Sequence, residues 1–261
     1  MFEGPQEELN KTNNAQLALF LSGHIACEYL KEQTGKSIEN LAKYLAGHSL
    51  GEYTALVQAG VFSFEDALRL VNKRAKFMFE ATQQNPGGMV AILGLKKEFI
   101  EDLTKSTGTF LANDNTIGQI VISGSKSKME EVSIKAKELG AKRVIELPVT
   151  GAFHSPLMQT ASVNMAKEID SIEMNDAIIP VIMNVTGIAH TKSDEIKENM
   201  KKQITGSVKW LETMEFMKYN GIKNIAELGT GNVLCGLFKK FDKEISTTSL
   251  TTIESFNKEY L

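Results

Sequence analysis

The sequence has few of the features that mark metal-binding, secreted or membrane-spanning chains. Its two cysteines, Cys27 and Cys235, each stand alone in an apolar stretch, without the paired spacing of a zinc site or a disulfide framework. We expect both to be reduced core residues. The longest apolar runs, such as 17–21 and 89–95, are too short to span a bilayer, and no signal-peptide pattern opens the chain. These absences predict a cytoplasmic protein without a membrane partner.

No charge of one sign dominates the chain. Lys and Arg total 29 against 32 Asp and Glu, which gives a net charge of -3. Because no run of basic residues interleaves with aromatics, we expect no nucleic-acid partner. A hydrophobic content of 42% over 261 residues is typical of a globular protein with one large domain, or with a large and a small one.

The first 85 residues predict a helix, a strand, a tight turn and two more helices. We expect Asn14 to cap the first helix and Gly35 to end it. A short apolar run at 41–46 predicts a strand, and residues 52–58 predict the helix after the turn. Ser and Asp at 63 and 66 resemble a capping box, which would begin a strongly amphipathic helix.

The cluster Asn-Pro-Gly-Gly at 85–88 is the strongest domain-boundary signal in the sequence. After it the pattern predicts strand, helix, strand, strand, helix, strand, which is the order of a ferredoxin-like split unit. The expected ranges are strand 89–95, helix 97–106, strands 109–113 and 119–123, helix 126–139 and strand 143–147. We therefore predict a small subdomain at 86–147, inserted into a large domain formed by 1–85 and 148–261.

The rest of the chain alternates between helices and strands. The expected ranges are helix 155–169, strand 180–184, helices 194–203 and 208–219, strand 224–228 and helix 233–241. Such alternation predicts a parallel sheet covered on both faces. The expected fold class is thus α/β, with a hydrolase-like, parallel-sheet large domain and an inserted ferredoxin-like small subdomain.

Residues 47–51, Gly-His-Ser-Leu-Gly, match the Gly-x-Ser-x-Gly nucleophile elbow. In such an elbow the hydroxyl of Ser49 is exposed on a sharp turn between strand and helix, and the Leu50 N–H is placed to receive an oxyanion. The same five letters also fit a glycine-rich turn with a capping serine. The apolar run before the turn and the helix after it favour the catalytic interpretation.

A serine hydroxyl is a poor nucleophile until a base takes its proton. The chain has four histidines as candidates for that base. His154 lies at the centre of Gly-Ala-Phe-His-Ser-Pro (151–156), where glycine and proline would hold a short loop against the core. His24 lies within the first helix, His190 in a polar loop, and His48 in the turn itself. His154 is therefore the candidate base, although a lone histidine also fits a structural role.

Arg74 lies on the helix after the elbow, among apolar residues. A solvated charge on a helix surface is the default interpretation. Alternatively its stem lies on apolar surface, and its guanidinium holds a carboxylate through two parallel hydrogen bonds. A fixed cation near a nucleophilic serine would favour an anionic acyl group.

Taken together, these residues resemble the malonyl-CoA:acyl carrier protein transacylases and the related acyltransferase domains of polyketide synthases. Four motifs match in order over essentially the whole chain. They are Gly-Pro-Gln-Glu-Glu-Leu-Asn-Lys-Thr at 4–12, Gly-His-Ser-Leu-Gly-Glu-Tyr at 47–53, Arg-Ala-Lys-Phe-Met at 74–78 and Gly-Ala-Phe-His-Ser at 151–155. Residues 227–234 resemble the family's Gly-Pro-Gly loop, with threonine in place of proline.

The resemblance implies roles for five residues. Ser49 is the nucleophile and His154 its general base, in a Ser-His dyad without a carboxylate. Arg74 clamps the malonyl carboxylate, and the Leu50 N–H is one oxyanion donor. The family orients its histidine through the backbone carbonyl of a glutamine, which aligns here with Gln203.

The resemblance also implies the substrate and the partner. The expected reaction lifts malonyl from malonyl-CoA and passes it to the phosphopantetheine thiol of acyl carrier protein in fatty acid biosynthesis. Members with a Gly-x-Phe-His pattern resemble malonyl-selective enzymes, so we expect Phe153 to wall off an added methyl group. Met78 is expected to line the substrate site. We expect no cofactor, no metal and a monomer.

Two other functions stay open at this point. A serine esterase or thioesterase of the α/β-hydrolase type shares the elbow, and it would require an Asp or Glu beside the histidine. The family begins with a strand and a Gly-Gln-Gly-Ser-Gln loop, whose first glutamine is the second oxyanion donor, and this sequence starts downstream of both. Loss of one such donor costs about a hundred- to a thousand-fold in turnover. The sequence is therefore either a truncated complete enzyme or an impaired, carrier-binding remnant.

Overall fold

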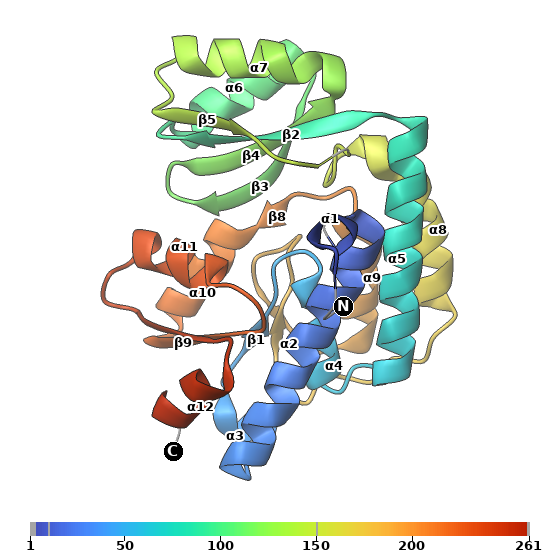
Figure 1. Cartoon of the computed structure of the whole chain (residues 1–261), viewed down its shortest axis with the longest axis vertical. Coiled ribbons are helices and arrows are strands. Elements are labelled where there is room, and N and C mark those ends of the chain that lie inside the picture. The colour runs from blue at the N-terminus through green and yellow to red at the C-terminus, as the bar shows by residue number, and fades with distance from the viewer. Residues whose placement is uncertain (1–3, 10, 150, 260–261) are drawn as a thin grey trace.

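The structure is a computed structural model, which describes residues 4–9, 11–149 and 151–259. Asn10, a member of the first motif, lies outside the described residues. The chain has a sheet with two helices at one end and a group of longer helices around short strands at the other (Figure 1). This mixture confirms the expected α/β class.

The sheet at one end follows the ferredoxin-like order that the sequence predicts. Its strands β5, β2, β4 and β3 lie in that order, and all neighbours among these four are antiparallel. Helices α6 and α7 pack on one face, over apolar side chains such as Ile92, Ile100 and Val132. The elements are β2 (Gly87–Leu93), α6 (Lys97–Thr107), β3 (Phe110–Thr116), β4 (Gln119–Ser125), α7 (Lys126–Glu138) and β5 (Arg143–Glu146). The boundaries of a subdomain at 86–147 stay a prediction.

A fifth strand, β8 (Val208–Lys209), joins this sheet from the C-terminal half of the chain. It pairs in parallel with β3, opposite Asn113 and Asp114. The sequence predicted a helix from residue 208, and that start is wrong, because α10 begins only at Trp210 (Trp210–Tyr219). Buried, β-branched Val208 instead pairs with the open edge of β3.

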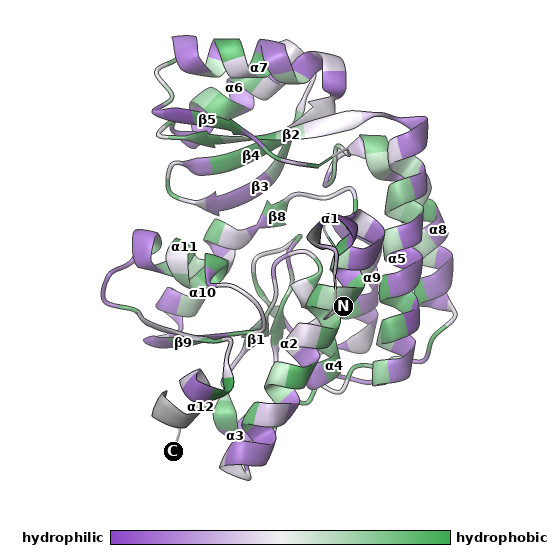
Figure 2. Ribbon diagram, viewed as in Figure 1, coloured by the Kyte–Doolittle hydropathy of each residue, from purple (hydrophilic) through white to green (hydrophobic). Residues whose placement is uncertain are grey.

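The longer helices pack around one large hydrophobic core. They are α2 (Thr12–Thr34), α4 (Gly51–Gln58), α5 (Phe64–Gln84), α8 (Gln159–Asp170) and α9 (Ser193–Gln203). Hydrophobic and hydrophilic residues alternate in bands along α5, as a helix with one buried face requires (Figure 2). The predicted cap of α5 is confirmed, because Ser63 Oγ accepts from the Asp66 N–H at 3.0 Å.

The strands among these helices are shorter and more divided than expected. β1 (Leu45–Ala46) pairs in parallel with β6 (Val181–Ile182), which pairs antiparallel with β7 (Ala189–His190). β9 (Asn224–Leu228) pairs in parallel with β10 (Ser246–Leu250) in a separate sheet. Parallel pairing is present, as the sequence predicts, but the parallel strands form two sheets rather than one.

Some predicted boundaries were wrong. Asn14 does not cap α2, whose N-cap is Lys11, and its amide instead donates to the Glu8 carbonyl at 2.8 Å, which ties α1 (Gln6–Leu9) to α2. Helix α3 (Ile38–Leu41) takes the start of the strand expected at 41–46. The helix expected from 155 opens with a 3₁₀ turn, η1 (Pro156–Met158).

The C-terminal part consists of α11 (Val233–Phe241), β10 and α12 (Ile253–Glu259), and the sequence analysis missed the last two. Gly35 has φ 61 and ends α2 as predicted. Cys27 and Cys235 are both free and buried, as expected. None of the described helices is long and apolar enough to cross a membrane.

Candidate active site

The turn that carries Ser49 is held in a strained backbone conformation. Ser49 has φ 51 and His154 has φ 56, and among the described residues these are the only two non-glycine residues with positive φ. Such a conformation costs on the order of 1–3 kcal/mol per residue and persists only where the surroundings enforce it. Gly47 cannot carry a side chain, because a Cβ there would overlap the Gly51 carbonyl. The turn therefore presents the half-buried side chain of Ser49 to its neighbours.

Asn184 fastens this turn from the neighbouring strand. Its Oδ1 accepts from the Ser49 N–H at 2.6 Å, and its Nδ2 donates to the Gly47 carbonyl at 2.7 Å. Asn184 is completely buried and follows β6, just as the turn follows β1. Since the carboxyl ends of parallel strands meet at one edge, the pairing of β1 with β6 brings the two segments together.

Ser49 and His154 form a hydrogen-bonded pair. Ser49 Oγ lies 2.9 Å from His154 Nε2, and the carbonyls of Gln203 and Gly206 lie 3.0 and 3.1 Å from His154 Nδ1. Because carbonyls only accept, Nδ1 carries the hydrogen and Nε2 is free to take the serine proton. Within the described part of the chain no carboxylate bonds the His154 ring.

The surroundings of His154 keep its imidazole neutral. Burial, together with the nearby Arg74 and His48, lowers the pKa of His154 to about 3, although the hydrogen bonds to the two carbonyls act in the opposite direction. A neutral imidazole can accept a proton, whereas an imidazolium cannot. The pair is thus in the protonation state that nucleophilic attack by Ser49 requires.

Arg74 lies in the same cluster, and its side chain is 1% exposed. Its Nη2 donates to Ser49 Oγ and to Gln203 Oε1, both at 3.0 Å, and its Nη1 donates to Gln16 Oε1. Its guanidinium also lies 5.6 Å from the centre of the Tyr53 ring. The default interpretation as a surface charge is therefore wrong.

A buried carboxylate, Glu52, connects these parts. Its Oε2 accepts from the Asn184 backbone N–H at 2.6 Å, and its Oε1 accepts from Gln203 Nε2 at 2.9 Å. Gln203 Nε2 also donates to the Ser49 carbonyl at 2.8 Å. Burial raises the pKa of the Glu52 carboxyl to about 7, against the opposing effect of these hydrogen bonds and of Arg74.

Sequence reasoning missed Glu52, Asn184 and Gln16. Glu52 belongs to the motif at 47–53, and Asn184 is a polar residue at the end of the apolar run expected as strand 180–184, so the sequence contained a signal for both. Gln16 contacts Arg74 from α2, and no local pattern marks it. These residues converge only through tertiary packing.

The remaining predicted residues lie around this centre. Leu50 is the N-cap of α4, and no hydrogen bond from its N–H is found in the described structure, which leaves that donor available. Met78 is one helical turn beyond Arg74, with its Sδ 3.6 Å from Gln16 Nε2. Half-buried Phe153 packs between two hydrophobic clusters. The substrate roles of these three residues stay predictions.

The other three histidines have different surroundings. His24 Nδ1 accepts from Gln58 Nε2 at 3.0 Å, and its ring stacks on Phe64, so His24 belongs to the packing of α2. His190 bonds Glu195 near the surface. His48 Nε2 lies 2.8 Å from Asn115 Oδ1, on strand β3.

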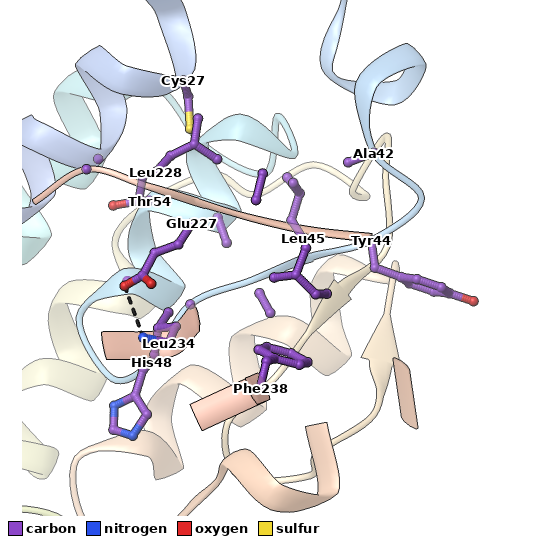
Figure 3. Close-up of a pocket in the computed structure, with 18 of the residues that line it drawn as sticks. Cys27, Ala42, Tyr44, Leu45, His48, Thr54, Glu227, Leu228, Leu234 and Phe238 are labelled. Carbon is purple, nitrogen blue, oxygen red and sulfur yellow. Dashed lines mark hydrogen bonds between the residues drawn. The ribbon is translucent and has the colours of Figure 1, made fainter. Parts of the chain in front are cut away.

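A cavity of about 880 Å³ lies beside the turn but not at its serine. It lies between β1 and β9, and its lining includes His48 and Leu50, whereas Ser49 and His154 do not line it (Figure 3). Its walls are mostly apolar, as the labelled Leu45 and Phe238 illustrate. At its rim the Leu234 N–H donates to Glu227 Oε1 at 3.1 Å, which caps the start of α11. This cavity is therefore not where the hydroxyl of Ser49 reacts.

Comparisons with known proteins reveal a likeness to acyl transferases. A family model described as acyl transferase domain matches residues 1–218. The malonyl CoA-acyl carrier protein transacylase of Bacillus subtilis (strain 168) is 41% identical over 260 residues, which cover 98% of this chain and 80% of that protein. The protein of the same name from Staphylococcus aureus (strain MSSA476) is 38% identical, with coverages of 97% and 82%.

Solved structures agree with this likeness. An acyl-carrier-protein-S-malonyltransferase from Bartonella henselae superposes with a TM-score of 0.93 at 37% identity, over 98% of this chain and 82% of that one. A type II PKS acyl-carrier protein in complex with its malonyl-transacylase gives a TM-score of 0.92 at 36% identity, with coverages of 98% and 82%.

Replacing Asn184 tests how the turn is held. Asn184→Ala leaves the buried Ser49 N–H and Gly47 carbonyl without partners, so we expect the free energy of unfolding to fall by at least about 2 kcal/mol. Urea denaturation measures the change. Asn40→Ala removes an exposed amide that bonds only Ser37, and it should cost less than about 0.5 kcal/mol. Equal losses for the two variants would contradict this account of the turn.

The pKa of His154 can be measured directly. Because burial lowers that pKa to about 3, we expect the ring to stay neutral from about pH 8 down to about pH 5, where an unperturbed histidine is protonated. Nitrogen-15 NMR follows the protonation of each imidazole, and loss of one signal set in His154→Gln identifies this ring. A His154 titration with its midpoint between about pH 6 and pH 7 would show that burial does not control the base.

Proposed function

Because the chain belongs to the acyl transferase family of malonyl CoA-acyl carrier protein transacylases, we propose that Ser49 carries the malonyl group and that His154 moves the protons. The enzyme transfers malonyl from malonyl-CoA to the phosphopantetheine thiol of acyl carrier protein, in fatty acid biosynthesis. The observation that supports these roles is the 2.9 Å contact between Ser49 Oγ and His154 Nε2, with Arg74 on the same hydroxyl.

In the first half-reaction we propose that Ser49 Oγ attacks the malonyl thioester carbonyl. His154 Nε2 takes the hydroxyl proton as the new C–O bond forms. The negative charge on the carbonyl oxygen is received by the Leu50 N–H at the start of α4. When the C–S bond breaks, the coenzyme A sulfur takes the proton from His154, which leaves malonyl-Ser49 and a neutral imidazole.

The second half-reaction runs the same steps in reverse order. The phosphopantetheine thiol of the carrier gives its proton to His154, and its sulfur attacks the malonyl-Ser49 ester. Breaking the ester bond returns the proton from His154 to Ser49 Oγ. The cycle uses the two thiols, the side chains of Ser49 and His154, and the backbone N–H of Leu50. As the sequence predicts, we further propose that it proceeds without a cofactor, in a cytoplasmic monomer.

Arg74 gives the site its preference for an anionic acyl group. A guanidinium that is 1% exposed lacks the hydration that stabilises a charge in water, and the raised pKa of Glu52 weakens the negative charge of this nearby carboxyl group. A malonyl carboxylate would restore a full countercharge through strong, charge-assisted hydrogen bonds. We therefore propose that Arg74 binds the carboxylate of the substrate.

The geometry disfavours an esterase of the α/β-hydrolase type. Such an enzyme orients its histidine with a carboxylate, whereas two backbone carbonyls contact His154 Nδ1 here. A buried arginine on the nucleophile also has no use in the hydrolysis of neutral esters. The dyad and the cation together support acyl transfer to a second thiol.

The acyl-enzyme can be detected by intact mass. After brief incubation with malonyl-CoA we expect a malonyl adduct on the wild type, which moves to the thiol of a phosphopantetheinylated carrier when that carrier is added. Ser49→Ala should form no adduct, because it lacks the attacking oxygen. The control is Ser63→Ala, which changes an exposed helix cap distant from the turn. An adduct that persists in Ser49→Ala would refute the proposed nucleophile, and one lost to water would indicate a hydrolase.

Acyl selectivity tests Arg74. In Arg74→Ala we expect kcat/KM for malonyl-CoA to fall about a hundredfold or more, since the carboxylate would enter a buried site unpaired, while kcat/KM for acetyl-CoA changes less than about tenfold. Arg69→Ala, on an exposed face of the same helix, should alter neither value. Equal losses for both thioesters would show that Arg74 positions Ser49 rather than the substrate.

A further inference from the structure

The side chain of Gln203 connects a buried anion to a buried cation. Its Nε2 donates to Glu52 Oε1 at 2.9 Å, and its Oε1 accepts from Arg74 Nη2 at 3.0 Å. The same Nε2 also donates to the Ser49 carbonyl at 2.8 Å. Gln203 is completely buried, and Glu52 and Arg74 are each 1% exposed. Because water hardly reaches these groups, each needs its partners within the protein.

The ionised carboxylate of Glu52 fixes the direction in which this amide points. A carboxylate only accepts hydrogen bonds, and a guanidinium only donates them. The amide nitrogen of Gln203 must therefore face Glu52, and the amide oxygen must face Arg74. The other oxygen of Glu52 accepts from the backbone N–H of Asn184 at 2.6 Å, so both carboxylate oxygens face donors.

A proton taken up by Glu52 would reverse this arrangement. The protonated carboxyl group has an O–H donor, which would meet either the Asn184 N–H or Gln203 Nε2. The N–H of Asn184 belongs to the backbone and cannot turn, whereas the amide of Gln203 can. A turned amide would present its oxygen to Glu52 and its nitrogen to Arg74, donor against donor. The Ser49 carbonyl would lose the donor that it has now.

We propose that Glu52 is a positioning residue for acyl transfer, whose ionised form sets the Gln203 amide and whose protonated form turns that amide away from Arg74 and Ser49. The proposal rests on the proposed roles of Ser49 and Arg74. Ser49 is affected through its backbone carbonyl, and Arg74 through the Nη2 that also donates to Ser49 Oγ at 3.0 Å. One proton thus changes the surroundings of the nucleophile and of the cation together.

The other ionisable groups of this cluster keep one charge state near neutral pH. Arg74, on α5, keeps its charge, as arginine does in proteins. Burial raises the pKa of Tyr53, on α4 itself, to about 12. Burial also lowers the pKa of His48, and it is the main reason why the pKa of His154 is lowered to about 3. Since burial raises the pKa of Glu52 to about 7, its carboxyl group changes charge where these four groups do not.

The pH profile of Ser49 acylation tests the proposal, with the rate measured by rapid quench and intact mass at saturating malonyl-CoA. For the wild type we expect the rate to fall about tenfold from about pH 8 to about pH 6, because about nine-tenths of Glu52 is ionised at the higher pH and about one-tenth at the lower. Glu52→Gln places a fixed donor where the protonated carboxyl group has one. Its rate should be about thirtyfold below the wild type at about pH 8 and change less than about twofold over this range.

A second variant tests whether Glu52 acts through the amide. Gln203→Met removes the amide but keeps the backbone carbonyl that contacts His154 Nδ1. It should slow acylation about as much as Glu52→Gln and also remove the pH dependence, and it provides the test if Glu52→Gln does not fold. Because both changes break one connection, the double variant should be no more than about threefold slower than either single variant.

Glu227→Gln is the matched control. The Glu227 carboxylate also accepts from two N–H groups, those of Leu234 and Cys235 at 3.1 and 2.7 Å, but at the start of α11. This variant should keep the pH profile of the wild type. The proposal is overturned if the wild-type rate does not change with pH, if Glu52→Gln keeps the wild-type fall, or if the losses of the two single variants multiply in the double variant. A wild type that forms no malonyl adduct at about pH 8 overturns the proposed function first, which is a separate result.

Discussion

The buried carboxylate of Glu52 is the interaction on which the rest of the site depends. It holds the backbone of Asn184 and the side chain of Gln203, which lie 132 and 151 positions further along the sequence. Asn184 fixes the turn of Ser49, and Gln203 reaches both His154 and Arg74. A single acidic group thus sets the distances between nucleophile, base and cation. Its burial is costly, and the hydrogen bonds that it accepts offset that cost.

The site shows how a protein maintains strained residues without using glycine. Ser49 and His154 both adopt positive φ, where glycine would be favoured, but glycine supplies neither a hydroxyl nor an imidazole. The strain is balanced by bonds to neighbouring segments, with Asn184 on the turn and two carbonyls on the histidine ring. The same bonds that enforce the backbone also orient the reacting atoms. Stability and catalysis therefore depend on one network.

Local patterns in the sequence predicted part of this arrangement. The capped and amphipathic α5 and the order of elements from β2 to β5 follow from periodicity and turn residues, and the structure confirms them. The division into two sheets and the pairing of β8 with β3 depend on contacts between distant segments, which periodicity does not contain. Likewise Ser49 and His154 stand in recognisable motifs, whereas Gln16 acquires its meaning only beside Arg74.

Strand β3 belongs to the five-stranded sheet, and it contacts segments outside the ferredoxin-like unit at three successive positions. Asn113 and Asp114 pair with β8, and the next residue, Asn115, bonds His48, the neighbour of Ser49. The strands β2 to β5 therefore cannot shift far along β8 without pulling on the residue that precedes the nucleophile. In mechanical terms β3 is a tether, through which a load on the strands β2 to β5 would reach the residue beside Ser49.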